Sequence, residues 1–181
     1  GVAKFRLGDK KFAAPLLNRA ADSGSGNTAA HARFLLAQLE FERVRFALRP
    51  KVLSPALLKA ASVNVQSVEG ALQKVIDMEQ GQWIVGSLYM LGRLQLELAR
   101  FLSEGQPSEG VTAMQLQQSM SEQVVKVRER AQEYFTRCQK IATERQIFTK
   151  FLDGCKRPSS QLVSEADDFL APSQSREANE Q

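Results

Sequence analysis

Three separated segments of the chain carry small and bulky residues at one shared helical spacing. In each segment the second residue comes four positions after the first, and the third comes three positions later. The sets are Ala13, Leu17 and Ala20; Ala71, Val75 and Met78; and Ala131, Phe135 and Cys138. Residues three and four apart lie on one face of an α-helix. Each segment is therefore predicted to be a helix with a narrow stripe facing a neighbour.

A matching signal precedes each stripe. A small residue is followed four positions later by a bulky one at Gly1 and Phe5, at Ala37 and Phe41, and at Gly92 and Leu96. A small residue lets two helices approach closely, and a bulky one fills the groove beside it. The alternation predicts an all-α fold of stacked helical hairpins. An irregular helical bundle with the same core positions is the alternative.

Helix-breaking residues divide the chain into elements. The predicted helices cover residues 2–7, 12–21, 27–48, 55–61, 67–79, 82–103, 111–145 and 147–152. Gly8, Pro50 and the Gly105–Pro107 segment mark the clearest boundaries, and residues 111–145 contain neither Gly nor Pro. No apolar stretch reaches the roughly 20 residues that a membrane-spanning helix needs, so no transmembrane segment is expected.

The segment from Leu7 to Ala20 resembles the hairpin turn and second helix of a tetratricopeptide repeat. The resemblance implies a right-handed α-solenoid of about three antiparallel helix pairs over residues 1–157, with the first helix cut by the start of the chain. The spacing from Gly1 to Ala13 fits the family, whereas those from Ala37 to Ala71 and from Gly92 to Ala131 are much longer, so elongated helices are expected. The implied repeat positions are Gly1, Gly8, Ala13, Leu17, Ala20, Ala37, Ala71, Val75, Gly92, Ala131 and Phe135.

The sequence offers no set of residues for catalysis. His31 is the single histidine, and neither Cys nor acidic residues are arranged around it as metal ligands. We expect it to be exposed in the first turn of its helix. Gly24 and Gly26 lie in a connector without the preceding strand that a nucleotide-binding loop needs. No catalytic, cofactor-binding or metal-binding residue is therefore predicted, and neither enzymatic activity nor a small-molecule substrate is expected.

Two cysteines fall near the end of the predicted fold. Cys138 lies on the stripe of the long helix and Cys155 follows in the closing segment. A hairpin could bring them together, so a disulfide and two buried free thiols are both open. The chain is also similar to helix-repeat proteins of bacterial cell envelopes that end in a cysteine-bearing hairpin. That similarity implies a periplasmic or cell-envelope location, with the cytoplasm as the alternative.

Candidate partner-binding residues come from one basic group and one aromatic residue. The densest basic group consists of Arg43, Arg45, Arg49 and Lys51, and its three arginines are the candidates for partner binding. Trp83 is a residue type that is common in binding hot spots. Nucleic-acid binding is less favoured because Phe46 is the only interleaved aromatic residue that could stack on bases. A protein partner, held as a peptide or helix in a concave groove, is expected instead.

Residues 158–181 differ in composition from the rest. They carry Arg176 against Glu165, Asp167, Asp168, Glu177 and Glu180, and they are poor in apolar residues. A disordered acidic tail is expected there. Taken together, the sequence predicts a non-catalytic scaffold or adaptor within a larger assembly. The alternatives are a nucleic-acid-binding helical repeat and a cytoplasmic adaptor or chaperone.

Ala13 tests the predicted hairpin packing. Replacing Ala13 with Leu should overpack the contact between the first two helices and lower the free energy of unfolding by roughly 1 to 3 kcal/mol. The measurement is the midpoint of chemical denaturation of the variant against the wild type. An unchanged midpoint would count against the repeat register.

Overall fold

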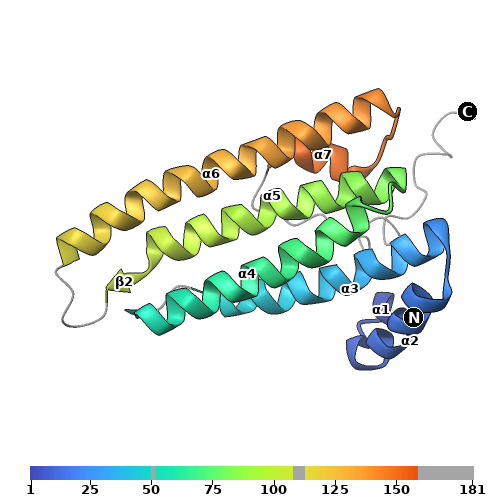
Figure 1. The fold of residues 1–181 in the computed structure, drawn as a ribbon, viewed down its shortest axis with the longest axis horizontal. Coiled ribbons are helices and arrows are strands. Elements are labelled where there is room, and N and C mark those ends of the chain that lie inside the picture. The colour runs from blue at the N-terminus through green and yellow to red at the C-terminus, as the bar shows by residue number, and fades with distance from the viewer. Residues whose placement is uncertain (50–51, 108–112, 159–181) are drawn as a thin grey trace, which may run out of the picture.

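The computed structural model describes residues 1–49, 52–107 and 113–158, and within these ranges the chain is all-α. Its helices are α1 (Val2–Arg6), α2 (Lys10–Ser23), α3 (Gly26–Ala47), α4 (Pro55–Ile76), α5 (Gly81–Glu104), α6 (Ala113–Glu144) and α7 (Lys150–Lys156). Helices α3 to α6 lie roughly alongside one another, and α1 and α2 form a small hairpin at one end (Figure 1). The predicted tail, from residue 159 onwards, lies outside the described residues.

Each helix from α1 to α6 packs on the next helix along the chain. Helix α1 packs on α2, α3 on α4 and α5 on α6, and each pair contacts the next through α2 with α3 and α4 with α5. Helix α3 also contacts α5, and α7 packs on both α5 and α6. One continuous apolar core runs through these contacts from Phe5 to Cys155. Helix α5 lies at its centre, because every residue from Trp83 to Gln95 is buried.

The prediction of two helices at 55–61 and 67–79 is wrong, because α4 runs unbroken from Pro55 to Ile76. No Gly or Pro separates the two predicted pieces, and Ala61, Val65 and Val68 continue one buried stripe across them. Its start was predicted correctly: Ser54 caps the helix by accepting a hydrogen bond from the Leu57 N–H at 3.2 Å.

The closing helix begins three residues later than predicted. Gln146 adopts a positive φ of 54°, which turns the chain after α6, and α7 starts at Lys150.

Two very short strands were not predicted at all. β1 (Val52–Leu53) and β2 (Gln106–Pro107) pair in parallel, with Val52 opposite Gln106, and join the loop after α3 to the loop after α5. Gly105 permits this contact, since a Cβ there would lie 2.3 Å from Leu53.

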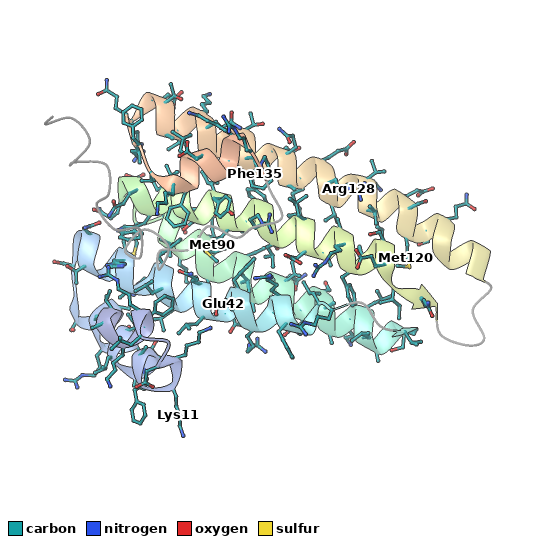
Figure 2. All side chains as sticks on the ribbon, turned by 180° about the vertical axis from the view of Figure 1, so that it is seen from behind. Lys11, Glu42, Met90, Met120, Arg128 and Phe135 are labelled. Carbon is teal, nitrogen blue, oxygen red and sulfur yellow. A yellow bond between two sulfur atoms is a disulfide. The ribbon has the colours of Figure 1, made fainter. Side chains whose placement is uncertain are left out.

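Two glycines that mark predicted repeat positions sit at close helix contacts. A Cβ on Gly92 of α5 would lie 2.6 Å from the ring of Phe135 of α6, and one on Gly1 would lie 3.0 Å from Leu17 of α2. Phe135 is labelled on α6 in Figure 2. Leu17 follows Ala13 by four positions, and Phe135 follows Ala131 by four. In both pairs the glycine therefore contacts the equivalent residue of a predicted stripe. The turn at Gly8 also has the predicted character, because its φ is +78°.

No helix among the described residues is both long and apolar enough to cross a membrane.

Gly92 and Gly70 form a matched pair for testing these contacts. Gly92→Ala should lower the free energy of unfolding by about 1 to 3 kcal/mol, because Phe135 is fully buried and cannot yield to the new methyl group. Gly70→Ala, in α4, meets nothing within 4 Å and should raise stability by about 0.5 to 1 kcal/mol through helix propensity alone. Urea denaturation of both variants checks the pair, and equal stability of both would contradict the predicted packing.

Candidate functional site

Helices α3 and α5 share a seam, which we define by the α5 stripe Gly86, Arg93, Glu97 and Arg100 and the facing α3 residues. Spacings of seven, four and three place these α5 residues on one face of the helix. On α3, Phe34 and Arg45 face the same seam: a Cβ on Gly86 would lie 2.9 Å from the Phe34 ring, and Arg45 Nε lies 3.5 Å from Glu97 Oε1. The seam is therefore apolar at one end and charged at the other.

Helix α7 covers the apolar end of the seam. The ring of Phe151 lies edge-on to Phe34, with centroids 5.5 Å apart, and also reaches Gly86, where an added Cβ would be 3.3 Å away. Gly154 packs directly on Tyr89, where a Cβ would lie 2.5 Å from the phenol ring. From Phe151 to Gly154 along α7, the contact on α5 moves from Gly86 to Tyr89. Helix α7 therefore runs in the same direction as α5.

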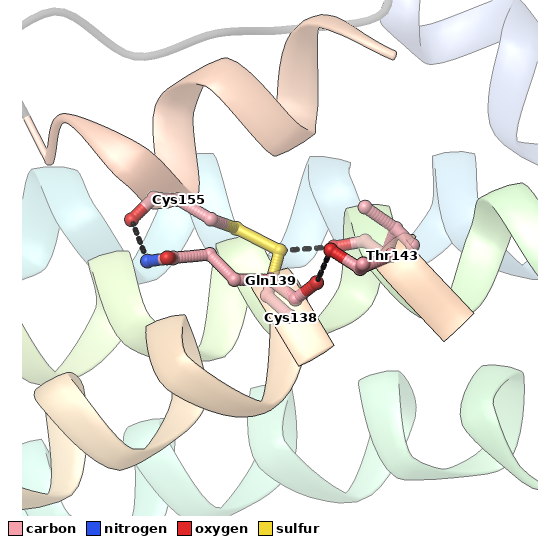
Figure 3. The surroundings of a disulfide bond; sticks show 5 residues. Cys138, Gln139, Thr143 and Cys155 are labelled. Carbon is pink, nitrogen blue, oxygen red and sulfur yellow. Dashed lines mark hydrogen bonds between the residues drawn. A yellow bond between two sulfur atoms is a disulfide. The ribbon is translucent and has the colours of Figure 1, made fainter. Parts of the chain in front are cut away.

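A disulfide between Cys138 and Cys155 fixes α7 on α6, with their Cα atoms 6.3 Å apart. The side-chain amide of Gln139 donates a hydrogen bond to the Cys155 carbonyl at 2.9 Å (Figure 3). Thr143 in turn donates to the Gln139 carbonyl at 2.9 Å. Of the two states that the sequence left open, the structure has the bonded one, and α7 is attached to the long helix by a covalent and a polar contact.

The charged end of the seam is an open groove of about 560 Å³, which we call the α3/α5 groove. Its lining residues are Glu42, Arg45, Phe46, Arg49, Arg100 and Glu104. Phe46 is 66% exposed, and the Arg49 guanidinium carbon lies 4.3 Å from the centre of its ring. An exposed phenyl ring among arginines offers an apolar contact and charged hydrogen-bond donors side by side.

One buried carboxylate organises the arginines beside this groove. The Glu97 side chain is 7% exposed, and Arg100 lies closest to it, with Nη2 at 2.8 Å from Oε2. Arg45 Nε and Arg93 Nη2 approach the other oxygen, at 3.5 and 3.6 Å. Three guanidinium groups therefore share a single carboxylate, which holds Arg45 and Arg100 in place on adjacent helices.

The groove keeps a surplus of positive charge. Its two rim carboxylates are Glu42 and Glu104, and Glu42 is already paired with Lys10 of α2. Figure 2 labels Glu42 on α3. Counting Arg93 and Glu97, four arginines face three glutamates here. Acidic ligands are favoured by such a surplus next to a low-dielectric wall.

The structure separates the predicted partner-binding residues. Arg45 and Arg49 both line the groove. Arg43 lies on the α4 side of α3, where it donates to Glu40, which also accepts from Ser67 of α4. The hydrogen bond from Arg43 lowers the pKa of Glu40, so this pair stays ionised and engaged within the fold.

The expectations that Trp83 binds a partner and that His31 is exposed are both wrong. Trp83 is not available as an anchor, because it is only 6% exposed and its Nε1–H donates to Asn27 Oδ1 at 2.6 Å. His31 is not fully exposed but half-buried, with its ring stacked on Trp83 at 4.3 Å. The two rings cover the contact between α3 and α5 near its start, which is a packing role.

Sequence reasoning missed Arg93, Glu97 and Arg100. Their spacing along one helix face, continuing from Gly86, was a signal that could have revealed a charged stripe. The missing information was that this stripe faces Arg45 of α3, which depends on how the two helices pack.

A second, smaller cavity between α4 and α6 is lined by Glu69, Arg130 and Tyr134. There Glu69 accepts a hydrogen bond from Gln95 at 2.7 Å and lies 3.9 Å from Arg130, so its charge is compensated within the protein.

In the described part of the chain, no three His, Cys, Asp or Glu residues are grouped as a metal site. Comparison with known proteins finds no family model, no curated protein and no solved structure that matches this chain.

The disulfide can be tested chemically. Unreduced protein from its native compartment should show no alkylatable thiol after denaturation. Reduction should lower the free energy of unfolding by about 3 kcal/mol, because the bond closes a loop between residues 17 positions apart. A Cys138→Ala/Cys155→Ala variant is the control, since its stability should not respond to reductant. Two alkylated thiols in unreduced native material would contradict the bond.

Proposed function

We propose that this protein is a non-catalytic scaffold that holds an acidic segment of a partner protein in the α3/α5 groove. The single observation that carries the proposal is the groove itself, which is lined by Arg45, Arg49 and Arg100 together with the exposed Phe46 ring. Arginines can form bidentate hydrogen bonds with carboxylates, and an aromatic ring gives an apolar side chain a place to pack. An acidic peptide or helix with one apolar residue satisfies both.

The proposal includes a right-handed α-solenoid of the tetratricopeptide type. Three successive helix pairs and the contact of α3 with α5 support it, because in such folds the first helix of each pair packs on the first helix of the next. The equivalent contacts of Gly1 with Leu17 and of Gly92 with Phe135 support the same register in the first and third pairs. In this scheme the groove lies on the first helices of pairs two and three, and α7 closes the stack.

We further propose a cell-envelope location, as part of a larger assembly. The Cys138–Cys155 disulfide supports it, because such bonds persist in oxidising compartments such as the bacterial periplasm. The rival proposal of nucleic-acid binding is weaker. Phe46 is the only aromatic residue among those that line the groove, so successive bases would find a single stacking platform there.

Charge reversal in the groove tests this function. The partner captured by immobilised full-length protein is identified by mass and purified, and its Kd is measured by titration. Arg49→Glu should weaken binding by roughly tenfold or more, since an attractive contact becomes repulsive. Arg45 is left unchanged because it compensates the buried Glu97 carboxylate. Higher salt should weaken wild-type binding, since exposed charges are screened.

Arg43→Glu is the matched control, because Arg43 belongs to the same helix but lies outside the groove. It should leave the Kd nearly unchanged. Equal loss of binding in both variants, or none in either, would refute the groove as the partner site. A partner that proves to be a nucleic acid would decide for the rival function.

A further inference from the structure

We propose that the α3/α5 groove has an occupant within the same chain, the acidic segment 162–170. The proposal builds on the groove of the proposed function and adds a competitor for the partner. The segment reads Leu162-Val163-Ser164-Glu165-Ala166-Asp167-Asp168-Phe169-Leu170. Its carboxylates and its Phe169 are the complement of what the groove presents.

The direction of α7 leads the chain towards the groove. Helix α7 lies on the seam beside Gly86 and Tyr89 and runs the same way as α5, so its C-terminal end points along the seam towards Arg100. The groove and α7 thus occupy consecutive stretches of one seam. The disulfide to Cys138 fixes the point from which the following residues depart.

The length of chain after α7 is sufficient. A rise of 1.5 Å per residue puts Arg100 about 16 Å beyond Tyr89 along α5. An extended chain spans about 3.3 Å per residue, so the stretch from Arg157 to Glu165 can cover about 26 Å. Asp167, Asp168 and Phe169 can therefore reach Arg45, Arg49 and Phe46 with slack to spare.

The charges and apolar residues of the segment match those of the groove in kind. Acidic residues at 165, 167 and 168 precede Phe169 and Leu170, and in the groove Arg45, Arg49 and Arg100 line the same surface as Phe46. Tethering makes binding intramolecular, with an effective concentration near the millimolar range, so even weak contacts suffice for occupancy. An acidic partner then has to displace the segment, which makes the groove selective for ligands that bind better than residues 162–170.

Photo-crosslinking in the full chain tests this assignment. Phe169 is replaced by p-benzoylphenylalanine, the protein is irradiated and digested, and the joined peptides are identified by mass. Crosslinks should fall on the α3 peptide around Phe46 and on the α5 peptide around Arg100. The same probe at Gln181 is the positional control and should not label these peptides.

Charge variants and isotope labelling sharpen the result. Asp167→Lys/Asp168→Lys should reduce the groove crosslinks by roughly tenfold, and combining it with Arg49→Glu should restore them, because that change leaves the Arg45–Glu97 ion pair in place. Circular dichroism of each variant checks that the helical fold is kept. In an equal mixture of unlabelled and nitrogen-15 protein, the crosslinked pairs should be of one isotope only.

Three outcomes would overturn the assignment. They are crosslinks outside the groove, groove crosslinks that ignore the charge variants, and pairs of mixed isotope, which would assign the groove to a second copy. The two proposals fail independently. Partner binding that needs Arg49 without groove crosslinks removes only the intramolecular occupant. Groove crosslinks with a partner whose binding does not depend on Arg49 remove only the proposed function.

Discussion

Aromatic rings seated against glycines set the distances between helices in this protein. Gly86 of α5 leaves room for Phe34 on one side, and Gly92 leaves room for Phe135 of α6 on another. Gly154 does the same for Tyr89, which brings α7 down onto the seam. Because a ring cannot yield within a close-packed core, each of these positions allows only a residue without a Cβ at this separation. The central position of α5 depends on them.

Close packing around α5 also has an electrostatic consequence. A helix surrounded by α3, α4, α6 and α7 buries its polar residues with its apolar ones, and Gln95 and Glu97 are among them. A buried carboxylate is costly unless its lone pairs are satisfied. The charge of Glu97 is compensated by ion pairs with Arg45, Arg93 and Arg100, and the same network places two of these arginines at the groove. The positively charged lining of the groove follows from a packing requirement.

Sequence patterns predicted the parts of this structure that are local. The limits of α3 and α5 agree with those expected from helix-breaking residues, and the close approach at Gly92 follows from a spacing of small and bulky residues. Contacts between helices that are distant in sequence were not predictable in this way. The network of Arg45 with Glu97, and the burial of Trp83 against His31 and Asn27, depend on how α3 crosses α5. Residue type alone made Trp83 resemble an anchor.

Under the proposed function, the charges and the aromatic ring of the groove contribute to binding in different ways. Arginines at a partly exposed rim mainly steer an acidic segment into place and raise the association rate, and salt screens that contribution. Contact with Phe46 depends on apolar area, which salt does not screen, and so acts mainly on dissociation. A ligand with carboxylates alone would bind fast and leave fast, whereas one with a neighbouring apolar residue would stay longer. Discrimination among acidic segments therefore lies with Phe46 more than with the arginines around it.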